Sequence, residues 1–223
     1  MQKTLKLQVS ESMAVGLLLA FTGGFLDAYT YVLRGGVFAN AQTGNIVMLG
    51  IHFFEGHYAK TLQYLIPISA FVLGVIVSQC IRSKFRYAKI HWRQLILLLE
   101  SVVLCGVAFV PTSANALANA AVAFVCSLQV DAFRKLNGNP YATTMCTGNL
   151  RSAAENLYHY GSSHKRQSLY TSLQYFSVIG VFIVGAGVGA VFSQRLGLMC
   201  ILIAPVVLLI TILLMLRSHT SRW

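Results

Sequence analysis

The chain has 223 residues, of which 56 % are hydrophobic and only 10 % are charged. Soluble domains carry about 25 % charged residues, so this composition excludes an ordinary soluble fold and predicts an integral membrane protein embedded in a lipid bilayer. The formal net charge is +11, yet no basic face with interleaved aromatic residues accompanies it, which argues against nucleic acid as a partner.

Six apolar segments approach the ~20 residues that a helix needs to cross a bilayer. They cover residues 13–32, 62–81, 95–110, 114–133, 169–192 and 196–216. We therefore predict an all-α fold with six transmembrane helices in a single membrane domain, residues 1–223. The third segment is long enough only if it begins at Trp92, whose indole ring suits the membrane interface.

The first segment is expected to be an uncleaved helix. Lys3 and Lys6 precede it, but no small-residue cleavage site follows, so a signal peptide is not indicated. Gly23 and Gly24 stand just before Asp27 and mark a place at which a membrane helix can bend or unwind.

Residues 35–51 follow this helix and do not resemble another crossing. They are too polar for one, at Asn40, Gln42 and Asn45, and too apolar for a plain loop. We predict a re-entrant or interfacial helix, with Thr43 as the N-cap of a helix that runs from Gly44 towards Phe54.

The pattern DAYTYVLRGGVFANAQTGN at residues 27–45 returns as DAFRKLNGNPYATTMCTGN at residues 131–149. Asp27 and Asp131 are the only aspartates in the chain, and a Thr-Gly-Asn run closes both copies at the same spacing. The match indicates an internal duplication. It predicts a second re-entrant or interfacial helix, capped by Thr147 and running through Asn156.

Repeat one covers about residues 12–110 and repeat two about residues 114–216. Each holds three predicted crossings, and an odd number requires the second copy to enter the membrane from the opposite side. Inverted repeats related by an axis in the membrane plane are a recurrent plan of secondary transporters. Small residues recur at every fourth position in the second and fifth segments, which we interpret as helix-packing contacts. They are Ala70, Gly74, Ser78, Gly185, Gly189 and Ser193.

The basic residues predict the orientation. If both ends are cytoplasmic, 14 of the 17 Lys and Arg residues fall on the cytoplasmic side, and only Arg34, Lys60 and Arg195 fall outside. The positive-inside rule therefore predicts a multi-pass inner-membrane protein whose N- and C-termini are cytoplasmic.

Three runs resemble those of a known family. They are GGFLDAYTYV at residues 23–32, GGVFANAQTGNIVMLG at residues 35–50 and the later Thr-Gly-Asn at residues 147–149. Together they resemble the YoaK-type family of bacterial inner-membrane proteins, a domain of unknown function, over nearly the whole chain. The resemblance implies a membrane location and topology and leaves the function open.

Asp27 and Asp131 are the first candidates for a site. A carboxylate inside the hydrocarbon costs at least ~2.5–3.5 kcal/mol, so it normally faces a partner, a cavity or an ion path. We expect the pair to bind a cation, a proton or an amine from opposite halves of the bilayer. The alternative is structural: Asp131 would pair with Arg134 or Lys135, and Asp27 would meet Arg34 or backbone amides.

The two Thr-Gly-Asn runs are the second candidates, as polar ligands for a small solute at a helix N-terminus. The alternative is a glycine-hinged cap, and either interpretation buries the runs between the repeats. The residues concerned are Thr43, Gly44, Asn45, Thr147, Gly148 and Asn149.

Other polar groups receive simpler interpretations. Glu100 is expected to snorkel or pair near the cytoplasmic end of its helix. The histidine pairs His52/His57 and His159/His164 are spaced by five residues, not by the four of a helical zinc pair, so no metal site is predicted. No catalytic set and no phosphate-binding loop is recognised, so neither an enzyme nor a cofactor is expected.

The leading functional hypothesis is a secondary transporter or channel-like permease for a small polar solute, proton or cation, with its site between the repeats. The alternative is a non-transporting membrane sensor or scaffold in which the aspartates are structural. Homo-oligomer formation is compatible with either.

Overall fold

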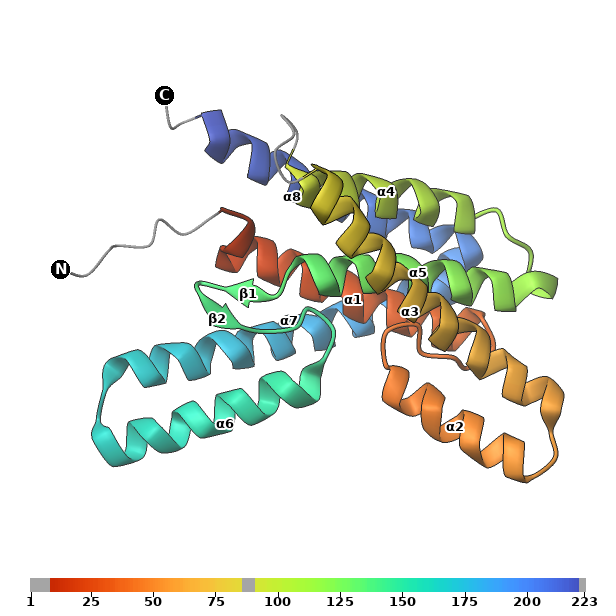
Figure 1. The fold of residues 1–223 in the computed structure, drawn as a ribbon, viewed down its shortest axis with the longest axis horizontal. Coiled ribbons are helices and arrows are strands. Elements are labelled where there is room, and N and C mark those ends of the chain that lie inside the picture. Colours follow the sequence, from red (N-terminus) through yellow and green to blue (C-terminus); the bar gives the residue numbers. More distant parts are fainter. Residues whose placement is uncertain (1–8, 86–90, 221–223) are drawn as a thin grey trace.

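The structure, a computed structural model, describes residues 9–85 and 91–220, with side chains up to residue 216. Lys3, Lys6, Arg86, Lys89 and Arg222, on which the predicted orientation partly depends, lie outside the described residues, as does the side chain of Arg217. The described chain forms eight α-helices (Figure 1): α1 (Met13–Leu33), α2 (Gln42–Phe54), α3 (Tyr58–Phe85), α4 (Trp92–Val107), α5 (Asn115–Ala132), α6 (Cys146–Ser163), α7 (Arg166–Leu196) and α8 (Ile203–Thr220). It also forms three 3-10 turns and one hairpin: η1 (Val9–Glu11), η2 (Thr112–Ala114), η3 (Gly197–Leu202), β1 (Lys135–Leu136) and β2 (Asn139–Pro140).

Four helical segments in the described part of the chain are long and apolar enough to cross a bilayer. They are Met13–Leu33, Tyr58–Phe85, Thr112–Ala132 and Arg166–Leu216. The last has 51 residues and contains α7 and, as far as Leu216, α8. The turn η3 joins these two helices and begins at Gly197 (φ +59°). The helices confirm the predicted all-α membrane class, while the number of six crossings stays a prediction.

The hairpin β1–β2 departs from the all-α expectation. Lys135 pairs with Pro140, and Leu136 pairs with Asn139. Between them Asn137 (φ 48°) and Gly138 (φ 83°) both adopt left-handed conformations. Asn-Gly is the preferred pair for a two-residue hairpin turn with two positive φ angles, so this short run follows a local rule that the sequence interpretation overlooked.

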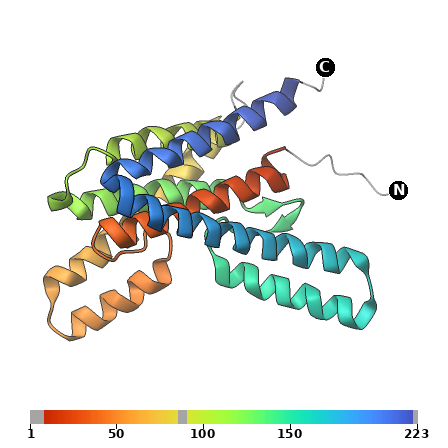
Figure 2. The ribbon, with the colours of Figure 1, turned by 180° about the vertical axis from the view of Figure 1, so that it is seen from behind.

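The helix contacts of the first half of the chain have counterparts in the second half. α1 packs along α7, and α5 packs along α3 in the same way. α2 lies on α3 as α6 lies on α7, and α4 contacts α5 as α8 contacts α1 (Figures 1 and 2). α4 and α8, which are counterparts of each other, are also in contact, so the two halves meet along this pair of helices.

Two of the small residues predicted as packing contacts hold the longest helix pairs together. A Cβ atom at Gly185 of α7 would overlap the carbonyl group of Phe21 on α1, and one at Gly74 of α3 would overlap the carbonyl group of Phe124 on α5. Close backbone approach of this kind is how membrane helices associate.

We expect Gly185→Leu to lower the thermal unfolding temperature of the purified protein in detergent, because α7 must move away from α1 to admit the side chain. Gly187→Leu is the matched control, since Gly187 lies two residues away on the same helix and has open space around it. Equal unfolding temperatures for the two variants would contradict the packing role.

Candidate functional site

The segment between α1 and α2 folds back along α1. The backbone N–H of Asn40 donates to Asp27 Oδ1 at 2.8 Å, and Asn40 Nδ2 donates to the carbonyl oxygen of Gly23 at 3.1 Å. Gly23 lies ten residues before the end of α1, so the chain returns by about 15 Å at ~1.5 Å per residue. α2 then leads outward again, the course that a re-entrant element follows.

The segment between α5 and α6 arrives at the same glycine. A Cβ atom at Gly23 would meet the side chain of Thr144 and, at 3.6 Å, the carbonyl oxygen of Thr143. Gly23 is therefore the point at which the returning segments of both copies meet.

The two aspartates have different partners. Asp27 is 6 % exposed and accepts the Asn40 amide. Asp131 is 5 % exposed, forms an ion pair with Arg134 and accepts a hydrogen bond of 2.6 Å from Gln79 Nε2. The structural alternative for each aspartate is thus realised: a backbone amide for Asp27 and Arg134 for Asp131.

The Asp27 to Arg34 contact that the sequence allowed is not the one that Arg34 makes. Arg34 is fully buried and donates instead to the Tyr29 hydroxyl and to carbonyl oxygens at the end of α4. The guanidinium group of Arg34 lies at the C-terminal end of α4, where carbonyl groups lack partners within the helix. These carbonyl groups attract a cation, which explains why Arg34 binds them and not Asp27.

The Thr-Gly-Asn runs are only partly buried. Asn45 and Asn149 are buried and each holds its own returning segment, through Asn45 Nδ2 to the Phe38 carbonyl and Asn149 Nδ2 to the Ala142 carbonyl, both at 2.7 Å. The expected burial is wrong for the other four residues, which are exposed. They are Thr43, Gly44, Thr147 and Gly148.

The predicted caps are also wrong. α2 has its N-cap at Ala41 and α6 has its N-cap at Met145, and neither cap makes a side-chain hydrogen bond. The helices begin one residue before each threonine, because the buried asparagine side chains bind the preceding segment and fix where the helical turns start. The predicted helix through residues 44–54 is confirmed apart from this start.

Glu100 is the largest departure from the sequence interpretation. It was expected near a helix end, but its side chain is 0 % exposed, and neither carboxylate oxygen has a hydrogen-bond partner among the described residues. α4 begins at Trp92, which places Glu100 two turns inside the helix, and α4 packs against both α5 and α8. The long side chain therefore has no path to the surface.

Glu100 and Asp27 belong to one polar region. The buried thiol of Cys126 on α5 lies near both carboxylates, and Cys146 at the start of α6 lies near Asp27. Several oxygen atoms here lack a hydrogen-bond partner in the described structure. We call the following set the central polar cluster: Asp27, Asn40, Glu100, Thr143 and Thr144.

The central polar cluster is rich in buried oxygen atoms, of which the amide and ionised carboxylate oxygens only accept hydrogen bonds and the threonine hydroxyls can also donate. The unpartnered atoms are Asn40 Oδ1, both Glu100 carboxylate oxygens and the two threonine Oγ1 atoms. Buried oxygens without donors are costly unless a ligand supplies the missing hydrogen bonds or charge. A cation, a proton or a solute with N–H or O–H groups would do so.

The sequence matches the family described as "Protein of unknown function (DUF1275)" over residues 15–214. The chain belongs to the DUF1275 family. A relative from Bacillus subtilis (strain 168), "UPF0700 transmembrane protein YoaK", is 27 % identical over 150 residues, which are 63 % of this chain and 64 % of that protein. The matched region therefore spans slightly less than two thirds of this relative's length. No solved structure matches the chain.

The DUF1275 membership confirms the predicted YoaK-type family. Together with the long apolar helices, the transmembrane relative identifies a multi-pass membrane protein.

Proposed function

We propose that this DUF1275 protein is a secondary transporter or channel-like permease for a small polar solute, proton or cation, and that the central polar cluster is its binding site. The site would lie between two inverted repeats of three transmembrane helices each, residues 12–110 and 114–216.

The arrangement of the helices supports inverted repeats. The chain runs one way along α1, α4 and α7 and the other way along α3, α5 and α8, so α1 and its counterpart α5 run in opposite directions (Figures 1 and 2). The start of α1 and the end of α8 lie at the same end of the molecule. An axis that exchanges α1 with α5 and α3 with α7 would also exchange the two ends of the bundle, as inverted transporter repeats require.

The distribution of charges supports an inner-membrane protein whose N- and C-termini are both cytoplasmic. A cavity of about 400 Å³ opens at the end of α3 and the start of α4. Four Lys or Arg residues and two acidic residues are among its lining: Glu11, Arg82, His91, Trp92, Arg93, Asp131, Ala132, Arg134 and Lys135. Basic residues concentrated at one end are typical of the cytoplasmic side, and Asp131 would then lie near that face.

Glu100 carries the proposal. A fully buried carboxylate whose two oxygens lack partners does not stabilise the fold, because burial of a charge is unfavourable unless another group compensates the charge. A bound proton, cation or ammonium group would compensate it. A structural role would instead be accompanied by an internal donor, as at Asp131 with Arg134 and Gln79.

The second candidate function is a non-transporting sensor or scaffold. The internal partners of the aspartates favour it, because Asp27 holds a returning segment and Asp131 holds an arginine. In that case Glu100 would be the one acidic side chain of the central polar cluster without an internal partner among the described residues.

A screen of the purified protein separates the two candidates. Alkali cations, protons, primary amines, amino acids and organic acids would be tested for an increase in thermal unfolding temperature, since a ligand that binds only the native state raises stability by about 2.7 kcal/mol at 100 times its Kd. We expect a cationic or donor-rich class to give a shift, and liposomes containing the protein to accumulate that ligand. A stabilising ligand without flux would favour the sensor, and no stabilising class at all would contradict the proposed site.

A further inference from the structure

The turn between α2 and α3 brings two histidines together. α2 ends at Phe54, and Gly56 follows with φ +76°. The His57 N–H donates to the His52 carbonyl at 2.8 Å, and the Gly56 N–H donates to the Phe53 carbonyl at 3.1 Å. This pair of hydrogen bonds is a Schellman motif, which folds the second residue after the helix back over the last turn. A spacing of five residues, which is unsuited to a straight helix, therefore places His52 beside His57.

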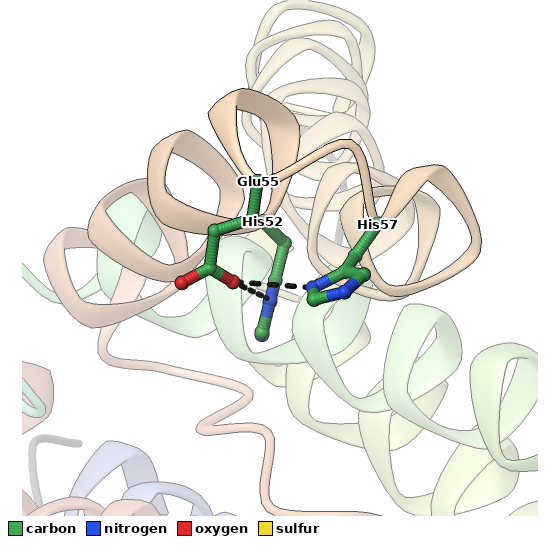
Figure 3. A group of neighbouring side chains, drawn as sticks. All are labelled: His52, Glu55 and His57. Carbon is green, nitrogen blue, oxygen red and sulfur yellow. Dashed lines mark hydrogen bonds and ion pairs between the residues drawn. The ribbon is translucent and has the colours of Figure 1, made fainter.

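The Nδ1 atoms of both rings lie close to one carboxylate oxygen (Figure 3). Glu55 Oε2 lies 3.3 Å from His52 Nδ1 and 3.2 Å from His57 Nδ1. One ligand atom from each of the three side chains lies within 4.8 Å of the others. A tetrahedral Zn²⁺ ion with bonds of ~2.0–2.1 Å separates neighbouring ligand atoms by about 3.3–3.4 Å. The two nitrogen–oxygen distances are close to that edge length before any ion pulls the ligands in.

The surroundings fit a site that is held on one side and open on the other. The His52 side chain is 12 % exposed, and its ring stacks on Tyr64 of α3 with 5.7 Å between centroids. The side chains of Glu55 and His57 are about half exposed, at 52 % and 58 %. A fixed inner ligand, two accessible outer ligands and room for water in the remaining position describe an entry path from solvent.

The second copy lacks this arrangement and provides an internal comparison. His159 in α6 and His164 at its C-cap have the same spacing, but His164 itself adopts the left-handed conformation (φ 50°), and no glycine follows at the position where Gly56 closes α2. Glu155 is engaged by Arg151 Nε at 2.7 Å. His52, Glu55 and His57 are the one group of three potential metal ligands that converges within the described residues.

We propose that the α2–α3 turn binds one divalent transition-metal ion of the zinc class through His52 Nδ1, Glu55 Oε2 and His57 Nδ1. Two imidazoles and a carboxylate form a donor set that suits Zn²⁺ and its neighbours and does not suit Mg²⁺ or Ca²⁺, which prefer oxygen ligands. The ion would join the end of α2 to the start of α3. It would lie at the end of the molecule away from the end of α8 (Figure 1), and it is independent of the central polar cluster.

The test is a Zn²⁺ titration of the full-length protein after chelator treatment, with Co²⁺ as the spectroscopic probe. We expect one equivalent of Zn²⁺ per chain. Removal of a group that only orients a metal ligand lowers metal affinity by about 10- to 100-fold. His57→Ala removes a ligand itself, so it should weaken Zn²⁺ binding by more than this. His57 is exposed, so the variant should keep the unfolding temperature of the metal-free wild type.

His164→Ala is the matched control and should bind Zn²⁺ as the wild type does. Cys80 and Cys105 are exposed and are competing ligands for the metal. Co²⁺ bound by a thiolate gives a charge-transfer band. Because the proposed site has no thiolate ligand, the Co²⁺ spectrum of the wild type should lack this band. Absence of Zn²⁺ binding, equal binding by His57→Ala and the wild type, or a thiolate band that accounts for the bound metal would each overturn the site.

Discussion

Replacing Arg34 with alanine is expected to lower the free energy of unfolding by about 3–5 kcal/mol, because several buried acceptors would lose a charged donor. The guanidinium group is completely buried and donates to the Tyr29 hydroxyl at 2.8 Å and to the carbonyl oxygens of Val107 and Val110 at 3.0 and 2.9 Å. The same guanidinium group donates to Asn115 Oδ1, at the start of α5, at 3.3 Å. One side chain thus joins the end of α1 to α4 and α5.

The free energy can be measured by reversible unfolding in mixed micelles of a mild detergent and dodecyl sulfate. Arg195→Ala is the control, since Arg195 is an exposed basic residue in the last turn of α7, and a surface substitution should change stability by less than about 0.5 kcal/mol. Arg34→Lys should remain destabilised, because an ammonium group cannot reach three separated acceptors as a guanidinium group can. A loss below about 1 kcal/mol for Arg34→Ala would show that the contacts contribute little.

Glu100→Gln is expected to keep the fold and to abolish the response to the ligand. Glutamine preserves the shape of the side chain but carries no charge, so the cost of burying a carboxylate disappears and the unfolding temperature should equal or exceed that of the wild type. A cation or ammonium ligand would lose its charge partner, so the stabilisation that it gives the wild type should fall by at least about 2 kcal/mol, the range for a hydrogen-bonded charge.

The control for this change is Glu155→Gln. Glu155 is exposed and paired with Arg151 in α6, so the loss of its charge should alter neither stability nor ligand response. The measurement is the shift in unfolding temperature on addition of the ligand found in the screen. A shift of the same size in Glu100→Gln and the wild type would remove Glu100 from the site.

The predicted segments were close to the observed helices because long apolar runs and their flanking charges are local properties. The duplication was equally visible, since Asp27 and Asp131 keep their distance from the two Thr-Gly-Asn runs. Both features can be recognised without knowledge of how the helices pack.

The central polar cluster could not be predicted in the same way. Asn40 and Thr144 occupy equivalent positions in the two copies but differ in residue type, so the comparison of the copies drew attention to the Thr-Gly-Asn runs instead. Glu100 has Ala204 as its counterpart and was expected near a helix end. Only the packing of α4 between α5 and α8 shows that its side chain is enclosed.

Two turns that the sequence interpretation overlooked had local signals that could have been used. Asn137 and Gly138 form the Asn-Gly pair that favours a hairpin turn. Gly56 between His52 and His57 is the glycine that closes a helix and returns the chain over its last turn. The hairpin segment was treated as part of an all-helical fold, and the two histidines were treated as if they lay on a straight helix. In both cases the local turn signal of one or two residues was the better guide.

The inverted relation of the two repeats is the claim on which the transport proposal depends most directly. It can be measured with single cysteines at Ala59, beside the α2–α3 turn, and at Ser163, the last residue of α6 beside the α6–α7 turn, in a protein whose five native cysteines are alanine. Both residues are exposed. With a membrane-impermeant maleimide, we expect Ala59→Cys to be labelled in intact cells and Ser163→Cys to be labelled only after the membrane is opened. Labelling of both turns from the same side would contradict the inverted arrangement.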